Sequence, residues 1–292
     1  MGNQTERTDL TKMISGLVGS FPIESIYVNR CQNKTEKREL IILIKYSYSK
    51  KRAARIRQIE EAFNILPAVR AHCFTTRMAR AKIRNGNLFL FNSCQPHKLL
   101  YRDAKSAYSP IVEEFDLSRC LQHAISFDRR ENKKIQGFED AYYHFKANRS
   151  FGLAAFMLHQ TIELTYRYLS ILLTAKERIT HSIRHYHRHT MNICPIYNSI
   201  FDETQATDLI LLRFLEKAYR ESRYEDEFNV DLGMLDQLEA KMVRLRQHAQ
   251  YIFIYTLRHY ENGDYSGQDA PACAAVLRDA GSSYQEPLRL VC

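Results

Sequence analysis

Three polar side chains among the packing residues of an apolar-striped helical segment carry the strongest chemical signal in the sequence. His159, Gln160 and Glu163 interrupt residues 153–173, which read LAAFMLHQTIELTYRYLSILL. A helix places His159 and Glu163, four residues apart, on one face. The pair serves either a ligand or a polar network between packed helices, and we favour the network. A metal would need further ligands, and the sequence offers no partner cluster for one.

Two later segments add polar groups of similar chemistry. Residues 180–189, THSIRHYHRH, are dense in histidine and arginine. This density suits a pH-sensitive or metal-binding patch, but a loop or a helix start after Arg178, with Thr180 as a candidate N-cap, explains it more simply. Residues 219–228, YRESRYEDEF, place Arg223 beside Tyr224 and several acids. Arg223 is expected either to pair with Glu163 or Asp226, or to contact a phosphate, and the ion pair is favoured.

The N-terminal part of the chain offers little for metal-dependent nucleotidyl transfer. That reaction needs two carboxylates on one strand to hold a divalent metal against the phosphates. The strand predicted near residues 39–45, ELIILIK, supplies only Glu39. We therefore expect a scaffold without this activity.

Basic side chains gather around two predicted helices near the N-terminus. They suit either phosphate binding or a solvated helix face, and the solvated face is favoured. The formal charge of +9 also fits an acidic partner, although charge alone is weak evidence. The basic residues are Lys50, Lys51, Arg52, Arg55, Arg57, Arg77, Arg80, Lys82 and Arg84.

The first hundred residues are predicted to form short strands and helices. Residues 25–29, 39–45, 69–75 and 98–101 read as strands, and residues 50–64 and 77–84 read as helices. The near-continuous apolar run at 39–45 is typical of a strand covered on both faces. This order predicts a small α/β unit.

Longer helices are predicted from about residue 108 onward. Apolar residues recur with helical spacing in residues 115–148, 149–175, 204–224 and 231–262. In the last segment the stripe comprises Leu232, Leu235, Leu238, Met242, Leu245, Ala249 and Ile252. Such faces need partner helices, so we expect a helical bundle. The predicted fold class is α+β, with an α/β domain at 1–104, an all-α bundle at 105–262 and a flexible tail at 263–292.

Composition indicates a globular protein in a reducing compartment. The 292 residues are 45% hydrophobic, enough for a packed core. Seven scattered cysteines lack the spacing of a zinc site or a disulfide framework. The polar N-terminus lacks a signal-peptide core, and no run approaches the roughly 20 apolar residues of a membrane span. We expect a cytoplasmic protein without a membrane partner.

The helical part of the chain resembles the HEPN domains, a helical-bundle family associated with nucleotide and RNA biology. The matching residues are the polar helix at 153–173, then Thr174, Ile179, Thr180 and His181, and later Ala218, Tyr219, Ser222, Arg223, Tyr224 and Asp226. The first hundred residues resemble the degenerate nucleotidyltransferase-like domain that commonly precedes a HEPN domain. This combination is most familiar in bacteria of the Bacteroides type.

The resemblance implies a HEPN-type module that binds nucleotide or RNA, and a homodimer formed through the bundle. Its ligand-binding residues would be His159, Glu163, His181, Arg223 and Tyr224. No cofactor or metal is expected. Paired nucleotidyltransferase and HEPN proteins act as antitoxin and toxin, so the resemblance also implies an alternative, a ribonuclease of toxin-antitoxin or defence type.

Catalysis is an alternative, because active HEPN members are metal-independent ribonucleases. They use an arginine and a histidine a few residues apart for acid-base chemistry and phosphate stabilisation. The weak candidates here are Arg184 with His189, and Arg244 with His248. Neither pair stands where the family pattern requires it. A protein-interaction scaffold is the second alternative.

Overall fold

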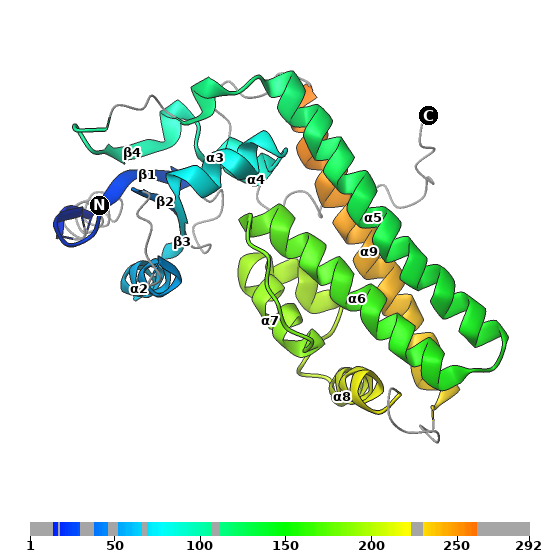
Figure 1. Cartoon of the computed structure of the whole chain (residues 1–292). Coiled ribbons are helices and arrows are strands. Elements are labelled where there is room, and N and C mark those ends of the chain that lie inside the picture. The colour runs from blue at the N-terminus through cyan, green and yellow to red at the C-terminus, as the bar shows by residue number, and fades with distance from the viewer. Residues whose placement is uncertain are drawn as a thin grey trace. The chain divides into compact units, whose positions relative to one another are not determined.

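The computed structural model describes residues 14–16, 18–29, 38–45, 52–65, 69–106, 111–222 and 230–261. The chain divides into two compact units, Met1–Leu121 and Gln122–Cys292. Figure 1 shows a small sheet with short helices in the first unit and long helices in the second. The predicted α+β class is therefore confirmed. The predicted tail at 263–292 lies outside the described residues, and the boundary at residue 104 stays a prediction.

A mixed sheet of four strands organises the first unit. The strands lie in the order β3-β2-β1-β4. Strand β2 pairs in parallel with β3 and antiparallel with β1, and β1 pairs antiparallel with β4. Because β2 is central, its run Leu40–Ile44 is buried on both faces, as its continuous apolar sequence predicts. The strands are β1 (Ile23–Asn29), β2 (Arg38–Ile44), β3 (Val69–Thr75) and β4 (Leu99–Arg102).

Besides the helical residues 14–16 and 18–20, three α-helices accompany this sheet in the described part of the chain. They are α2 (Arg52–Asn64), α3 (Thr76–Arg84) and α4 (Leu88–Ser93). Ile59 and Phe63 of α2 join the core cluster under the sheet. The side chain of Thr75 caps α3, and Gly86 takes a φ of 83° in the turn that follows. This left-handed conformation explains why the Asn85-Gly86 pair ends the helix.

Five α-helices build the described part of the second unit. They are α5 (Leu117–Ala147), α6 (Phe151–Thr174), α7 (Ile183–Ile193), α8 (Ala206–Glu221) and α9 (Leu232–Glu261). Helix α6 packs against α7, α8 and α9, so most of its circumference is buried. The predicted α9 stripe from Leu235 to Ile252 is buried. The prediction is wrong for Leu232, which begins the helix and stays 46% exposed.

Buried or half-buried polar side-chain pairs also hold the helices of the bundle together. Tyr142 and Lys146 of α5 both donate to Glu239 of α9. Tyr168 of α6 donates to Asp128 of α5, and burial raises the pKa of this carboxyl group. No helix within the described ranges has the length and hydropathy of a membrane span.

Candidate functional site

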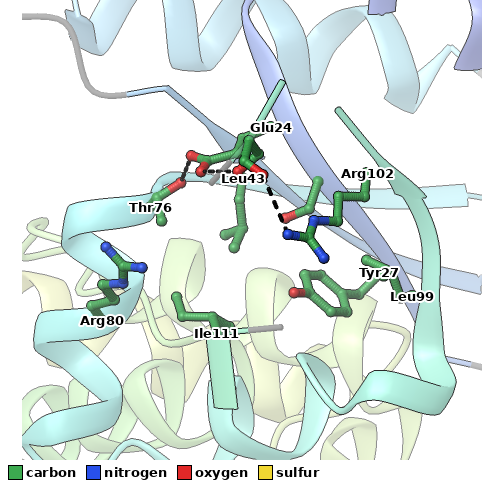
Figure 2. A pocket seen from close by; sticks show the side chains of 10 residues that line it. Glu24, Tyr27, Leu43, Thr76, Arg80, Leu99, Arg102 and Ile111 are labelled. Atoms are coloured by element: carbon green, nitrogen blue, oxygen red, sulfur yellow. Dashed lines mark hydrogen bonds between the residues drawn. The ribbon is translucent and has the colours of Figure 1, made fainter. Parts of the chain in front are cut away.

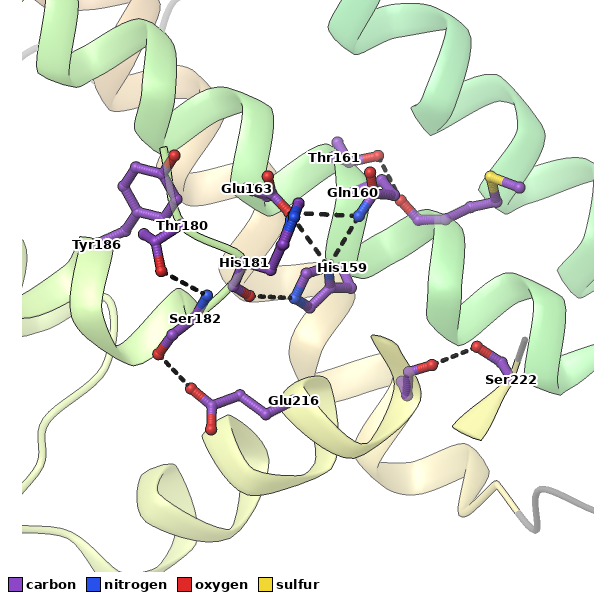
Figure 3. Close-up of polar contacts among 12 residues, drawn as sticks. His159, Gln160, Thr161, Glu163, Thr180, His181, Ser182, Tyr186, Glu216 and Ser222 are labelled. Atoms are coloured by element: carbon purple, nitrogen blue, oxygen red, sulfur yellow. Dashed lines mark hydrogen bonds and ion pairs between the residues drawn. The ribbon is translucent and has the colours of Figure 1, made fainter. Parts of the chain in front are cut away.

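The polar residues of α6 meet the connection that leads into α7. Figure 3 shows His159, Gln160 and Glu163 turned toward the segment that contains His181. His159 is fully buried and Glu163 nearly so, while the side chain of His181 is 59% exposed. The structure thus brings together three of the five predicted ligand-binding residues.

Both ring nitrogens of His159 are engaged in hydrogen bonds. Its Nε2 lies 3.1 Å from the backbone carbonyl oxygen of His181. A carbonyl oxygen only accepts, so Nε2 carries the proton and Nδ1 is left as an acceptor. The amide nitrogen of Gln160 lies 3.1 Å from this Nδ1 and donates to it. The buried imidazole is therefore a satisfied link between α6 and the connection to α7.

Glu163 is the acceptor at the centre of the network. Its Oε2 accepts from the Gln160 amide at 3.3 Å and faces His181 Nδ1 at 3.3 Å. The 3.8 Å approach of His159 Nδ1 to the same oxygen adds no hydrogen bond, because that nitrogen already accepts from Gln160. His181 is consequently held twice, by its backbone oxygen and by its imidazole.

An aromatic stack covers the other side of this network. The ring of Tyr219, from α8, stacks on His181 with centroids 4.7 Å apart and an interplanar angle of 18°. It also lies 4.8 Å from His159 and 6.1 Å from Phe156. Stacking and the Glu163 contact together fix the plane of the exposed His181 ring. We call His181 and Tyr219 the stacking platform.

The connection between α6 and α7 is shaped by its two helix ends. Ala175 ends α6 in the left-handed conformation with a φ of 56°. The N-cap of α7 is Ser182, whose Oγ accepts from the His185 amide and donates to Glu216 of α8. The prediction of Thr180 as N-cap is wrong by two residues, since Thr180 instead accepts from the Ser182 amide within the preceding turn.

Two of the predicted ligand-binding residues lie outside the described part of the structure. Arg223 and Tyr224 follow the end of α8 at Glu221, and residues 223–229 are not described. Arg223 stands four residues after Tyr219 in the sequence. Its predicted pairing with Glu163 or Asp226 stays a prediction.

The side chains of the first predicted Arg–His pair lie on different sides of one helix. Arg184 and His189 both belong to α7, five residues apart, which separates their side chains by about 140° around the axis. Arg184 is engaged by Glu203, to which its Nε and one terminal nitrogen donate at 2.9 and 2.8 Å. The structure does not bring these two side chains to one site.

The second predicted pair shares a face of α9, but its histidine is buried. His248 is 6% exposed, and its Nδ1 has no hydrogen-bond partner in the described structure. Burial, followed by the charge of Arg244, lowers the pKa of His248 to about 4. Arg244 donates to the backbone oxygen of Ser199 at 3.3 Å. These contacts favour a packing role over proton transfer to a substrate.

Glu39 of the first unit is already occupied by basic neighbours. Its Oε1 lies 3.2 Å from Arg70 and 3.9 Å from His72, both on β3. Burial alone would raise the pKa of Glu39, but the contacts with His72 and Arg70 outweigh it and lower the pKa. Among the described residues no group of three potential metal ligands converges.

A small polar pocket opens beside β1 in the first unit. Glu24 accepts hydrogen bonds from Thr76 and Ser106. Figure 2 shows Glu24 and Thr76 with Arg80 and Arg102 around the same space. The cavity measures about 20 Å³, which admits water but is far too small for a nucleotide. The candidate site of the protein is therefore the α6–α7–α8 network.

Comparison with known proteins identifies the class of this bundle. Residues 135–253 match the HEPN domain family, so the chain contains a HEPN domain over this range. No curated protein matches the chain. The matched range includes the whole network and the stacking platform, from Phe156 to Tyr219.

Sequence reasoning gave less weight to two groups that the structure makes prominent. Tyr219 was part of the HEPN resemblance, yet its role as the ring under His181 follows only from the packing of α8 on α6. Nothing in the local sequence marks Glu203 as a functional residue, because a single acidic residue between two helices forms no recognisable motif. Only the fold brings it to Arg184 and Arg188.

Proposed function

We propose that the HEPN domain of this chain binds a nucleotide or RNA at the stacking platform. The observation that carries the proposal is the exposed imidazole of His181, whose orientation is fixed by the buried carboxylate of Glu163 and by the ring of Tyr219. Nucleic-acid bases stack on aromatic and histidine rings whatever their sequence, since every base has a π-face. The overall positive charge of the chain adds attraction for phosphate.

The residues of the site divide into a contacting and a positioning group. His181 faces solvent and would touch the base, whereas His159 and Glu163 are buried and act through it. Arg223 and Tyr224 are added to the proposed site because the sequence resemblance implies them, and Arg223 would bind a phosphate. This division explains why an apolar core helix carries histidine and glutamate.

The proposal predicts that His181→Ala weakens binding of nucleoside monophosphates roughly tenfold, because each stacked base contributes about 1–3 kcal/mol. Isothermal titration calorimetry with AMP, GMP, CMP and UMP measures the loss of affinity. His185→Ala is the matched control, since His185 is an exposed histidine in the first turn of α7 and its removal should leave affinity unchanged. Equal losses in both variants, or no binding of any nucleotide or single-stranded RNA by the wild type, would refute the proposal.

Two finer points from the resemblance are proposals as well. The first unit is proposed to be a degenerate nucleotidyltransferase-like scaffold, supported by its mixed sheet and by a Glu39 already paired with Arg70. The homodimer is proposed from the resemblance. A ribonuclease is disfavoured by the separation of Arg184 from His189 and by the burial of His248.

A further inference from the structure

Two arginines of α7 share a single carboxylate. Arg188 donates through Nε to Glu203 Oε1 at 2.7 Å and through a terminal nitrogen to Oε2 at 2.6 Å. Arg184 donates twice to Oε2, at 2.9 and 2.8 Å. Glu203 is mostly covered, whereas the side chains of Arg184 and Arg188 are 40% and 54% exposed.

This cluster carries surplus positive charge and surplus donors. Two guanidinium groups against one carboxylate leave a net charge of +1. Each guanidinium has five N–H donors, and each spends only two on Glu203. The hydrogen bond from Arg188 and the contacts of Arg184 overcome burial and lower the pKa of Glu203 to about 2. The position therefore stabilises negative charge strongly.

Glu203 also fixes the two arginines in place. Long side chains normally lose rotamer freedom when they bind an anion, and this loss reduces affinity. Here the internal carboxylate has already ordered both guanidiniums. Arg184 and Arg188 are one helical turn apart, about 6 Å along the axis, on one face of α7. The helix begins two residues after His181, so the ordered pair lies close in sequence to the stacking platform.

We propose that Arg184 and Arg188 bind the phosphate backbone of a single-stranded RNA whose base stacks on His181. The inference rests on the proposed function and deepens it, because a second phosphate site selects a polynucleotide over a mononucleotide. Planar guanidiniums suit phosphate oxygens, to which they donate in pairs. Glu203 stays in place as the residue that orders them.

The test compares a labelled ten-nucleotide RNA with AMP on the full chain. Arg188→Ala is the main variant, since it leaves Glu203 paired with Arg184 and so preserves the local fold. We expect RNA affinity by fluorescence anisotropy to fall roughly tenfold, the value of a charge-assisted contact. The salt dependence of log K should lose about 0.7 of its slope for each phosphate contact removed. AMP affinity by calorimetry should stay unchanged.

A charge-matched control separates a defined contact from general attraction. Arg129→Ala removes one exposed arginine from α5, and should weaken RNA binding less than Arg188→Ala does. Equal losses in the control and in Arg188→Ala would overturn the inference, as would an equal loss for RNA and AMP. A wild type that binds AMP but not RNA refutes this inference alone. A wild type that binds neither refutes the proposed function.

Discussion

Glu163→Ala is expected to lower the free energy of unfolding by roughly 3 kcal/mol and to abolish nucleotide binding at the platform. The substitution removes the acceptor shared by Gln160 and His181, and hydrogen bonds to a charged group contribute about 1.5–3 kcal/mol each. It also frees the His181 ring from one of its two restraints. Urea denaturation followed by circular dichroism measures the first effect, and calorimetry with AMP measures the second.

Glu221→Ala provides the control for this prediction. Glu221 forms an i,i+4 pair with Lys217 on the surface of α8, and such pairs contribute no more than about 0.5 kcal/mol. It should therefore leave both stability and binding close to wild type. If Glu163→Ala were no more destabilising than Glu221→Ala, the network would not hold the connection between α6 and α7.

Acid should destabilise the helical unit through its buried histidines. The pKa of His248 falls from its ordinary 6.5 to about 4 in the folded state, chiefly because of burial. The unfolded state therefore binds a proton below pH 6.5 that the folded state refuses until about pH 4. Stability due to this group is present above pH 6.5 and is lost as the pH falls. Linkage gives a loss of about 2 kcal/mol between pH 7 and pH 5.

A variant without the titrating ring isolates this effect. His248→Phe keeps the ring against Tyr197, whose centroid lies 5.7 Å from that of His248, but removes the proton-binding nitrogens. Its stability should fall less between pH 7 and pH 5 than that of the wild type, by about 2 kcal/mol. Burial also lowers the pKa of His187, so some acid sensitivity should remain in the variant. Parallel pH curves for variant and wild type would contradict the prediction.

Periodic elements could be predicted closely from the sequence. Strand β3 runs from Val69 to Thr75 as predicted, and α9 follows its apolar stripe with an error only at its first residue. These elements depend on local alternation of apolar and polar residues, which the sequence displays directly. The preference for a satisfied network around His159 agrees with its two hydrogen bonds.

Contacts between distant segments were harder to predict. The sequence marked Arg184 as a catalytic candidate with His189, while the fold gives Arg184 to Glu203, nineteen residues away. For residues 180–189 the sequence does not decide between loop and helix; the structure begins α7 at Ile183 with Ser182 as its N-cap, and Ser182 also donates to Glu216 of α8. Such pairings depend on how α8 packs, and spacing along the chain does not encode that packing.

The most direct test of the platform is a histidine-selective NMR titration with AMP. Binding at the platform predicts that the imidazole resonances of His181 shift and saturate, while those of the exposed His185 stay in place. A ring current from a stacked base acts over a short distance, so this pattern locates the ligand. Saturable binding that leaves His181 unperturbed, or that moves His181 and His185 alike, would contradict a nucleotide site on the stacking platform.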